Sequence, residues 1–268
     1  MALVVFTDLD GTLLDHHDYS WQAARPALAA LKAAGAELVP CSSKTRAELL
    51  LLWDELGLAG PLISENGGGV FLPEAHVLAA LPGWRPAGPG WLAHPLGLGI
   101  AEVRRRLAVF KDIFGLRGFG EMSDQEVADL TGLDPRRAGL ARRREFNEPL
   151  LPASPALDGQ ALAQAARQAC LAITRGGRFL HALGGGDKGR AVALLSDMYR
   201  QGDPALLTAG LGDAPNDQGL LAAVDRPFLV ARPDGSHADI DLPGLVRVPL
   251  SGPAGWNRAV LSLLEELS

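Results

Sequence analysis

Two aspartates near the N-terminus, Asp8 and Asp10, directly follow the apolar run Leu3–Phe6. A run of this length predicts a buried parallel strand, and Gly11 favours a turn after it. Ligands of open α/β sheets bind at the carboxyl ends of the strands, where these carboxylates would lie. Two carboxylates repel each other unless a cation or a shared proton compensates. The pattern therefore predicts a Mg2+ site with one aspartate free to act as nucleophile or as acid and base, although a plain Asp-rich turn is the alternative.

A second acidic loop far downstream is built in the same way. The apolar run Leu206–Ala209 leads into a loop rich in glycine and aspartate, in which Asp213 and Asp217 are four residues apart. A helix with Asp213 as N-cap and Pro215 in its first turn would explain the same residues. The two interpretations are compatible, because a capping aspartate at a strand end can also face a bound cation.

Two shorter segments between the acidic loops contribute a hydroxyl group and a cation. Ser42 follows the expected strand over residues 36–40 and could offer its hydroxyl and nearby backbone N–H groups to a phosphate. A helix cap is the alternative for Ser42. Lys188 stands at the start of an expected helix, where the helix dipole disfavours a cation. That position favours a functional role for Lys188 over an ordinary solvated side chain.

In this order, the four segments resemble the motifs of the haloacid dehalogenase (HAD) superfamily of phosphotransferases. The narrower resemblance is to the mannosyl-3-phosphoglycerate phosphatase family, in the branch with a large cap inserted between the second and third motifs. The segments that carry this resemblance cover nearly the whole chain and are Ser42–Thr45, Ser64–Gly68, Met122–Ser123, Leu130–Leu133, Arg144–Pro149 and Gly177–His181.

The resemblance implies a role for each acidic residue. Asp8 is the expected nucleophile, which forms an aspartyl-phosphate, and Asp10 is the general acid that protonates the leaving oxygen and then activates water as a base. Lys188 is the third expected catalytic residue, a positive charge beside the nucleophile and the phosphate. Mg2+ is the implied cofactor. Its implied ligands are the carboxylates of Asp8 and Asp213 and the backbone carbonyl of Asp10, with Asp217 holding a metal-bound water or orienting Lys188.

Phosphate and substrate contacts are expected from the motif around Ser42, from the segment after the next strand and from the cap. For Lys44, a helix N-terminus with Thr45 as N-cap is an equal alternative, and for the second segment a plain turn is the alternative. Arg178 and His181 are expected on one face of the same cap strand, and both could face the crevice. The complete set of expected contacts is Ser42, Ser43, Lys44, Glu65, Asn66, Gly67, Arg144, Arg178 and His181.

The implied reaction is hydrolysis of mannosyl-3-phosphoglycerate to mannosylglycerate, a compatible solute, and phosphate. The only expected partner besides the metal is this small phosphorylated sugar–glycerate. Glucosyl-3-phosphoglycerate, sucrose phosphate and trehalose phosphate are alternative substrates, because the four motifs build the phosphate site and not the leaving-group site. A phosphohexomutase of related fold is a further alternative. A degenerate binding module is disfavoured, since Asp8, Asp10, Lys188 and Asp213 are all present.

Strands and helices alternate at both ends of the chain and predict an α/β fold with a doubly wound parallel, Rossmann-like sheet. We expect the first core segment over residues 1–83 and the second over 184–268. An α+β cap is expected over 84–183, after a stretch rich in proline and glycine over 82–99. The elements expected in the cap are helices over 101–114, 123–130 and 135–144 and a β-hairpin over 171–183.

Composition excludes several other classes. Of the 268 residues, 47% are hydrophobic and 21% charged, which indicates a globular protein. The net charge of −6 offers no basic surface for nucleic acid. No apolar run approaches the length of about 20 residues that spans a membrane, and no targeting signal precedes the first strand. We therefore expect a cytoplasmic monomer or homodimer without a nucleic-acid or membrane partner. Cys41 and Cys170 are expected to be small core residues.

Overall fold

Strand β1 (Leu3–Thr7) is an interior strand of the five-stranded core sheet, and its side chains are buried on both faces. Leu3 and Val5 pack into the hydrophobic cluster on one face, and Val4 and Phe6 pack into the cluster on the other. Burial of both faces is typical of a strand in a parallel sheet. The computed structural model describes residues 2–154, 157–176 and 179–267.

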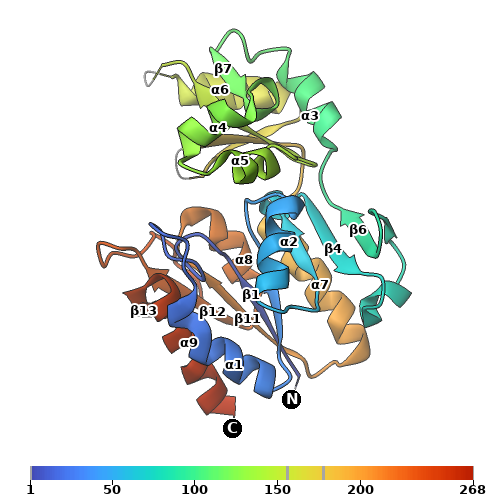
Figure 1. Cartoon of the computed structure of the whole chain (residues 1–268), viewed down its shortest axis with the longest axis vertical. Coiled ribbons are helices and arrows are strands. Elements are labelled where there is room, and N and C mark those ends of the chain that lie inside the picture. Colours follow the sequence, from blue (N-terminus) through green and yellow to red (C-terminus); the bar gives the residue numbers. More distant parts are fainter. Residues whose placement is uncertain (1, 155–156, 177–178, 268) are drawn as a thin grey trace.

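Five parallel strands make up this sheet. In spatial order they are β13 (Val246–Ser251), β12 (Arg226–Ala231), β11 (Leu207–Gly212), β1 and β2 (Glu37–Pro40). The helices on its two faces are α1 (Arg25–Ala33) and α9 (Gly252–Leu267) on one, and α7 (Lys188–Gly202) and α8 (Gln218–Ala222) on the other. The carboxyl ends of the strands point toward the smaller lobe, and both chain termini lie at the opposite end (Figure 1).

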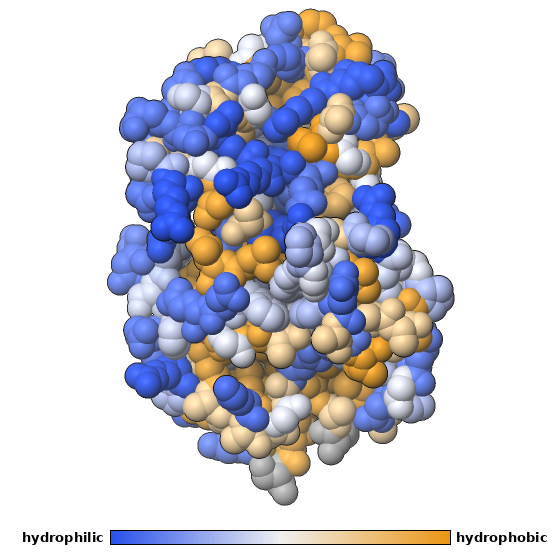
Figure 2. Space-filling model, turned by 45° about the vertical axis from the view of Figure 1, so that its right-hand side comes forward, coloured by the Kyte–Doolittle hydropathy of each residue, from blue (hydrophilic) through white to orange (hydrophobic). Residues whose placement is uncertain are grey.

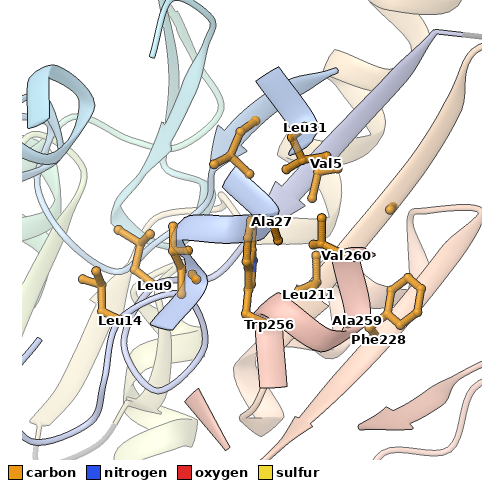
Figure 3. Packing of buried hydrophobic residues seen from close by; sticks show 14 of the residues in the cluster. Val5, Leu9, Leu14, Ala27, Leu31, Leu211, Phe228, Trp256, Ala259 and Val260 are labelled. Carbon is orange, nitrogen blue, oxygen red and sulfur yellow. The ribbon is translucent and has the colours of Figure 1, made fainter. Parts of the chain in front are cut away.

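The indole of Trp256 fills the space between the sheet and helices α1 and α9 (Figure 3). It is fully buried, and its Nε1 donates a hydrogen bond to Oγ1 of Thr7 at 3.0 Å. The Thr7 hydroxyl in turn donates to the backbone carbonyl of Asp8 at 2.6 Å. Packing in the core thus fixes the end of β1, where Asp8 stands.

A small antiparallel sheet continues beyond β2. Cys41 forms a parallel bridge with Ile63 of β3 (Leu62–Ser64), and the remaining strands are β4 (Gly69–Pro73), β6 (Trp91–Pro95) and β5 (Arg85–Pro86). The sequence predicted only β3 of these, because the prolines and glycines of residues 82–99 suggested a boundary. Since β6 pairs with β4 along its whole length up to Pro95, we propose that the first core segment extends to Pro95 and that the cap begins after it.

The smaller lobe is a four-stranded antiparallel sheet covered by helices (Figure 1). Its strands in spatial order are β7 (Leu116–Gly118), β8 (Asn147–Pro152), β10 (Phe179–Leu183) and β9 (Ala172–Gly176). One face packs against α3 (Ile100–Leu107) and α6 (Gly159–Gln168), and the other against α4 (Asp124–Thr131) and α5 (Pro135–Ala141). Successive side chains of a strand point to opposite faces of the sheet. Leu150 therefore packs with α3 and α6, and Leu151 with α4 and α5.

The predicted α/β fold with a parallel core sheet and an α+β cap is confirmed. Short 3-10 helices link the elements at Gln22–Ala24, Glu65–Gly67 (η2), Val77–Ala80, Phe119–Glu121 and Pro215–Asp217 (η5). The helix expected over 101–114 is shorter in the structure, where α3 ends at Leu107. Gly115, with φ +58°, completes the turn into β7.

Of the two cysteines, Cys41 is buried as predicted, but Cys170 is exposed, and its expected place in the core is wrong. Cys170 follows α6 with φ +55°, in the left-handed conformation that often ends a helix.

Among the described residues, no helix is both long enough and apolar enough to cross a membrane.

Candidate active site

The buried ammonium of Lys188 joins two carboxylates at the carboxyl end of the core sheet. Asp8 directly follows β1, Lys188 is the first residue of α7, and Asp217 ends η5 after β11. Lys188 Nζ lies 2.6 Å from Asp8 Oδ1 and 2.7 Å from Asp217 Oδ1. Parallel strands bring these residues together although 180 positions separate Asp8 from Lys188. Their side chains are almost entirely shielded from solvent.

Burial and mutual repulsion set the protonation of this cluster. Burial, followed by the charge of Asp217, raises the pKa of Asp8 well above its usual value, and Lys188 opposes that shift. Burial alone would lower the pKa of Lys188, but Asp217 and Asp8 outweigh it and hold that pKa well above the usual value. Lys188 is therefore a permanent cation, and it supplies the charge that favours an ionised Asp8.

Asp213 completes the acidic cluster from the loop after β11. Its carboxylate accepts a hydrogen bond from Thr12 Oγ1 at 2.8 Å, and burial together with Asp217 raises its pKa to about 6. Gly11 makes this approach possible, because a Cβ atom there would lie 2.8 Å from Asp213 Oδ2. Gly11 also has φ +86°, a conformation that favours glycine.

The cluster suits a divalent cation that prefers oxygen ligands. Carboxylate oxygens of Asp8, Asp213 and Asp217 lie within 4.8 Å of one another. Three carboxylates and the single ammonium of Lys188 leave a formal excess of negative charge, which a divalent cation would neutralise. Asp217 is the least available of the three: one of its oxygens accepts from Lys188, and the other from the backbone N–H groups of Asp213 and Ala214, each at 3.1 Å.

Asp10 lies beside this cluster and pairs with Lys44. Lys44 Nζ is 2.8 Å from Asp10 Oδ2, and it lies 5.1 Å from the centre of the Tyr19 ring. Burial would lower the pKa of Lys44, but Asp10 and then Glu48 outweigh it and raise that pKa. The Ser42 hydroxyl oxygen accepts the Lys44 N–H at 3.2 Å, so its own proton remains available for an anionic ligand.

A family model described as haloacid dehalogenase-like hydrolase matches residues 5–79, which include Asp8, Asp10 and Ser42. The chain is 40% identical to the glucosyl-3-phosphoglycerate/mannosyl-3-phosphoglycerate phosphatase of Methanococcoides burtonii over 270 residues, covering 98% of each chain. It is 37% identical to the protein of the same name from Persephonella marina, covering 99% of this chain and 98% of the relative. The chain belongs to the HAD-like hydrolases. The HAD membership and phosphatase class predicted from the sequence are thereby confirmed.

Solved structures share the fold of this chain at low sequence identity. A crystal structure from Thermoplasma acidophilum superimposes with a TM-score of 0.67 at 17% identity, covering 99% of this chain and 98% of the other. The sucrose-phosphatase of Synechocystis, solved with sucrose and phosphate, gives a TM-score of 0.60 at 16% identity, covering 98% of this chain and 97% of the other. Both similarities extend over the cap as well as the core.

Glu65 lies where the core of this HAD-like hydrolase meets its cap, and its role there differs from the expected substrate contact. The fully buried carboxylate accepts backbone N–H groups of Glu145, Phe146 and Asn147 at 2.7, 3.0 and 2.8 Å. Arg144 adds its guanidinium, with Nε 3.4 Å from Glu65 Oε2. Glu65 thus binds the loop that leads into β8 of the cap.

The Arg144 guanidinium also donates hydrogen bonds to two other protein groups. It donates to the carbonyl oxygen of Ser43 at 2.9 Å and to the side chain of Asn147. Ser43 therefore contributes its backbone to the joint between core and cap. In the cap, Glu148 accepts from Arg104 and from the N–H of Gly120, so neither Arg144 nor Glu148 is presented to the crevice.

Asn66 and Gly67 follow Glu65 in a strained turn, and all three have positive φ. The Oδ1 atom of Asn66 is buried without a hydrogen-bond partner among the described residues, which leaves it able to accept a hydrogen bond from a ligand. Gly67 packs on the start of α7: a Cβ atom there would lie 2.1 Å from the Asp187 carbonyl oxygen. Gly67 thereby allows the close approach that sets the position of Lys188.

His181 lies within the cap sheet, paired with Pro149 and Thr174, and is buried. Its side chain shares the face of Phe179, on the side of α4 and α5. Arg178 lies outside the described residues. Positions 178 and 181 are three apart, so a common face for the two side chains, which we expected, does not follow from strand geometry.

Several residues that support the site were not predicted. Thr12 directly follows the first motif, and its hydroxyl could have been recognised as a partner for the second acidic loop. Arg46 pairs with Glu145 at 2.9 Å and so links α2 (Arg46–Glu55) to the cap. Trp256 carried no local signal, since only the tertiary fold brings it to Thr7.

Proposed function

We propose that this HAD-like hydrolase is a Mg2+-dependent phosphatase of hexosyl-3-phosphoglycerates, with mannosyl-3-phosphoglycerate as its substrate. The observation that carries the proposal is the similarity, over 98% of both chains, to an enzyme named for glucosyl- and mannosyl-3-phosphoglycerate. The products would be the hexosylglycerate and inorganic phosphate.

In the proposed reaction Asp8 attacks the phosphorus in line with the leaving oxygen, and the phosphoryl group is transferred to its carboxylate. Lys188 favours the ionised nucleophile and offsets negative charge on the phosphoryl oxygens, while Asp217 holds the ammonium in place. A bound Mg2+, held by Asp8, Asp213 and the backbone carbonyl of Asp10, would supply further positive charge at the phosphate.

Asp10 is proposed to protonate the leaving glycerate oxygen and then to take a proton from the water that hydrolyses the aspartyl-phosphate. The Ser42 hydroxyl would donate to a phosphate oxygen, because its own oxygen already accepts from Lys44. The groups that act on the phosphate, namely Asp8, Asp10, Ser42 and Lys188, would serve any phosphate monoester, so the substrate preference must come from contacts with the leaving group.

The test is phosphate release from mannosyl-3-phosphoglycerate, glucosyl-3-phosphoglycerate, sucrose 6-phosphate, trehalose 6-phosphate and an aryl phosphate, with and without Mg2+. The proposal predicts Mg2+-dependent turnover with the highest kcat/KM on mannosyl-3-phosphoglycerate. Preference for the glucosyl ester would keep the mechanism and change the hexose. Turnover of the aryl ester alone would overturn the substrate assignment.

A further inference from the structure

A pocket of about 300 Å³ lies between core and cap, and Lys44, the partner of Asp10, is one of the residues that line it. Three parts of the chain form its walls: the loop after β1, helix α2, and the segment that contains α5 of the cap. Helix α5 sits directly over α2 in Figure 1, and the hydroxyl of Thr45 donates to the Leu140 carbonyl at 3.0 Å. The pocket volume is at the lower end of the range for small-molecule sites.

Lys44 connects this pocket with the reacting groups. Its side chain lines the pocket, and its ammonium is 2.8 Å from Asp10. In the proposed reaction the leaving oxygen must lie next to Asp10, so the rest of the leaving group must extend from that point. The pocket, which Lys44 lines, gives the rest of the leaving group the space to extend.

The walls carry the chemistry that a sugar acid requires. Trp21 lines the pocket, and its indole is held by a hydrogen bond from Nε1 to Glu55 Oε1 at 2.7 Å. An aromatic face with a polar edge suits a sugar ring, whose carbon–hydrogen face is apolar and whose rim carries hydroxyl groups. Tyr19 has φ +59°, and such a conformation in a residue other than glycine is typical of functional loops.

Arg137 brings a positive charge to the pocket from the cap. It is exposed on α5, and its Nε is 3.6 Å from Asp134 in a loose surface pair. Lys44 is already paired with Asp10, and Glu48 caps its own helix through Thr45. Arg137 is therefore the cation of the pocket that can most easily pair with a new carboxylate.

We infer that this pocket is the leaving-group subsite, in which Arg137 pairs with the glycerate carboxylate and Trp21, positioned by Glu55, packs against the hexose. The inference rests on the proposed function, and it makes Arg137 and Trp21 the residues that determine the substrate preference. Because Trp21 belongs to the core and Arg137 to the cap, the substrate is recognised only when the two parts are in contact.

The test compares mannosyl-3-phosphoglycerate with acetyl phosphate, which is too small to reach the pocket, in the full-length protein with Mg2+. Arg137→Ala is expected to lower kcat/KM on the sugar ester by roughly 10- to 100-fold, the usual effect of losing a charge-assisted hydrogen bond. Trp21→Ala is expected to lower it by roughly 10- to 100-fold through lost packing. Turnover of acetyl phosphate should not change. Arg136→Ala, one residue away on the exposed side of α5, is the matched control.

Selective loss on the sugar ester in both variants, with no loss in the Arg136 control, supports the inference. Equal losses on both substrates, or no loss on the sugar ester, would overturn it while leaving the proposed function intact. If the unmodified protein hydrolyses acetyl phosphate but no hexosyl-3-phosphoglycerate, the proposed function fails and the pocket assignment fails with it. Thermal melting of Arg137→Ala, whose side chain lies on the surface, identifies any loss caused by unfolding.

Discussion

At the scale of single residues, the site depends on one ammonium shared by buried carboxylates. Lys188 contacts Asp8 and Asp217, and Asp217 in turn accepts the backbone N–H groups of Asp213 and Ala214, just before η5. Each of these groups would be costly to bury alone. Together they hold Asp8, the proposed nucleophile, within hydrogen-bonding distance of its counterion before any substrate binds, which is the preorganisation that the proposed phosphoryl transfer requires.

Thr7 offers a test of how the core holds the end of β1, next to Asp8. Thr7→Val keeps the shape of the side chain but leaves the buried Trp256 Nε1–H without its acceptor. An unsatisfied buried donor costs about 1–3 kcal/mol, so the free energy of unfolding should fall by about that amount in urea denaturation. Thr7→Ser keeps the hydroxyl and is the control. If Thr7→Val were as stable as Thr7→Ser, the hydrogen bond to Trp256 would contribute nothing.

At the scale of elements, the cap is joined to the core through η2 and the loop before β8. Glu65 accepts three backbone N–H groups from that loop, Arg144 donates to Ser43, and Arg46 pairs with Glu145. The joint includes the backbone of Ser43, the neighbour of Ser42 in the chain. Movement of the cap would therefore also move Ser42, the proposed phosphate contact.

Glu65→Gln tests this joint. The amide NH2 of glutamine would face backbone N–H donors, so we expect the free energy of unfolding to fall by about 2–4 kcal/mol. We also expect faster proteolytic cleavage between core and cap. Glu145→Gln is the matched control: its partly exposed ion pair with Arg46 should cost at most about 1 kcal/mol. Equal stability of the two variants would show that Glu65 is not the main connection.

At the scale of the whole molecule, metal binding and protonation should be coupled. Asp213 has a pKa of about 6 in the folded protein against 3.8 as its ordinary value, so between these values the folded chain holds a proton that the unfolded chain has lost. The contribution of Asp213 to stability without metal is therefore present at low pH and is lost as pH rises toward 6. A cation must displace the same proton.

The increase in Tm on adding Mg2+ should therefore be larger at about pH 7.5 than at about pH 5. Differential scanning fluorimetry with and without Mg2+ at both pH values measures this difference. Asp213→Asn, which cannot hold the proton or offer a second carboxylate oxygen, should show little increase at either pH. An increase of the same size at both pH values in the unmodified protein would contradict a cation at this cluster.

The parts of this architecture that the sequence predicts are those encoded locally. The apolar run before Asp8, the glycine-rich turn at Asp213 and the helix start at Lys188 each combine a strand or helix signal with a polar residue at its end. The connections of Glu65 to residues 145–147 and of Trp256 to Thr7 could not be predicted, because they join distant segments through backbone groups or a core indole. Strand β6 was missed because flanking prolines and glycines concealed a short strand whose pairing is entirely tertiary.

In the proposed reaction Asp8 carries the phosphoryl group between the two steps, so an experiment that traps this intermediate tests the mechanism. Asp10→Asn lacks the base for the second step, but acetyl phosphate has a leaving group that needs no acid for the first. Asp10→Asn incubated with acetyl phosphate and Mg2+, then quenched in acid, should contain phosphate on the peptide with Asp8. Borohydride should convert that residue to homoserine, and the Asp8→Asn/Asp10→Asn double variant should carry no phosphate. Phosphate on another residue, or in the double variant, would show that Asp8 is not the nucleophile.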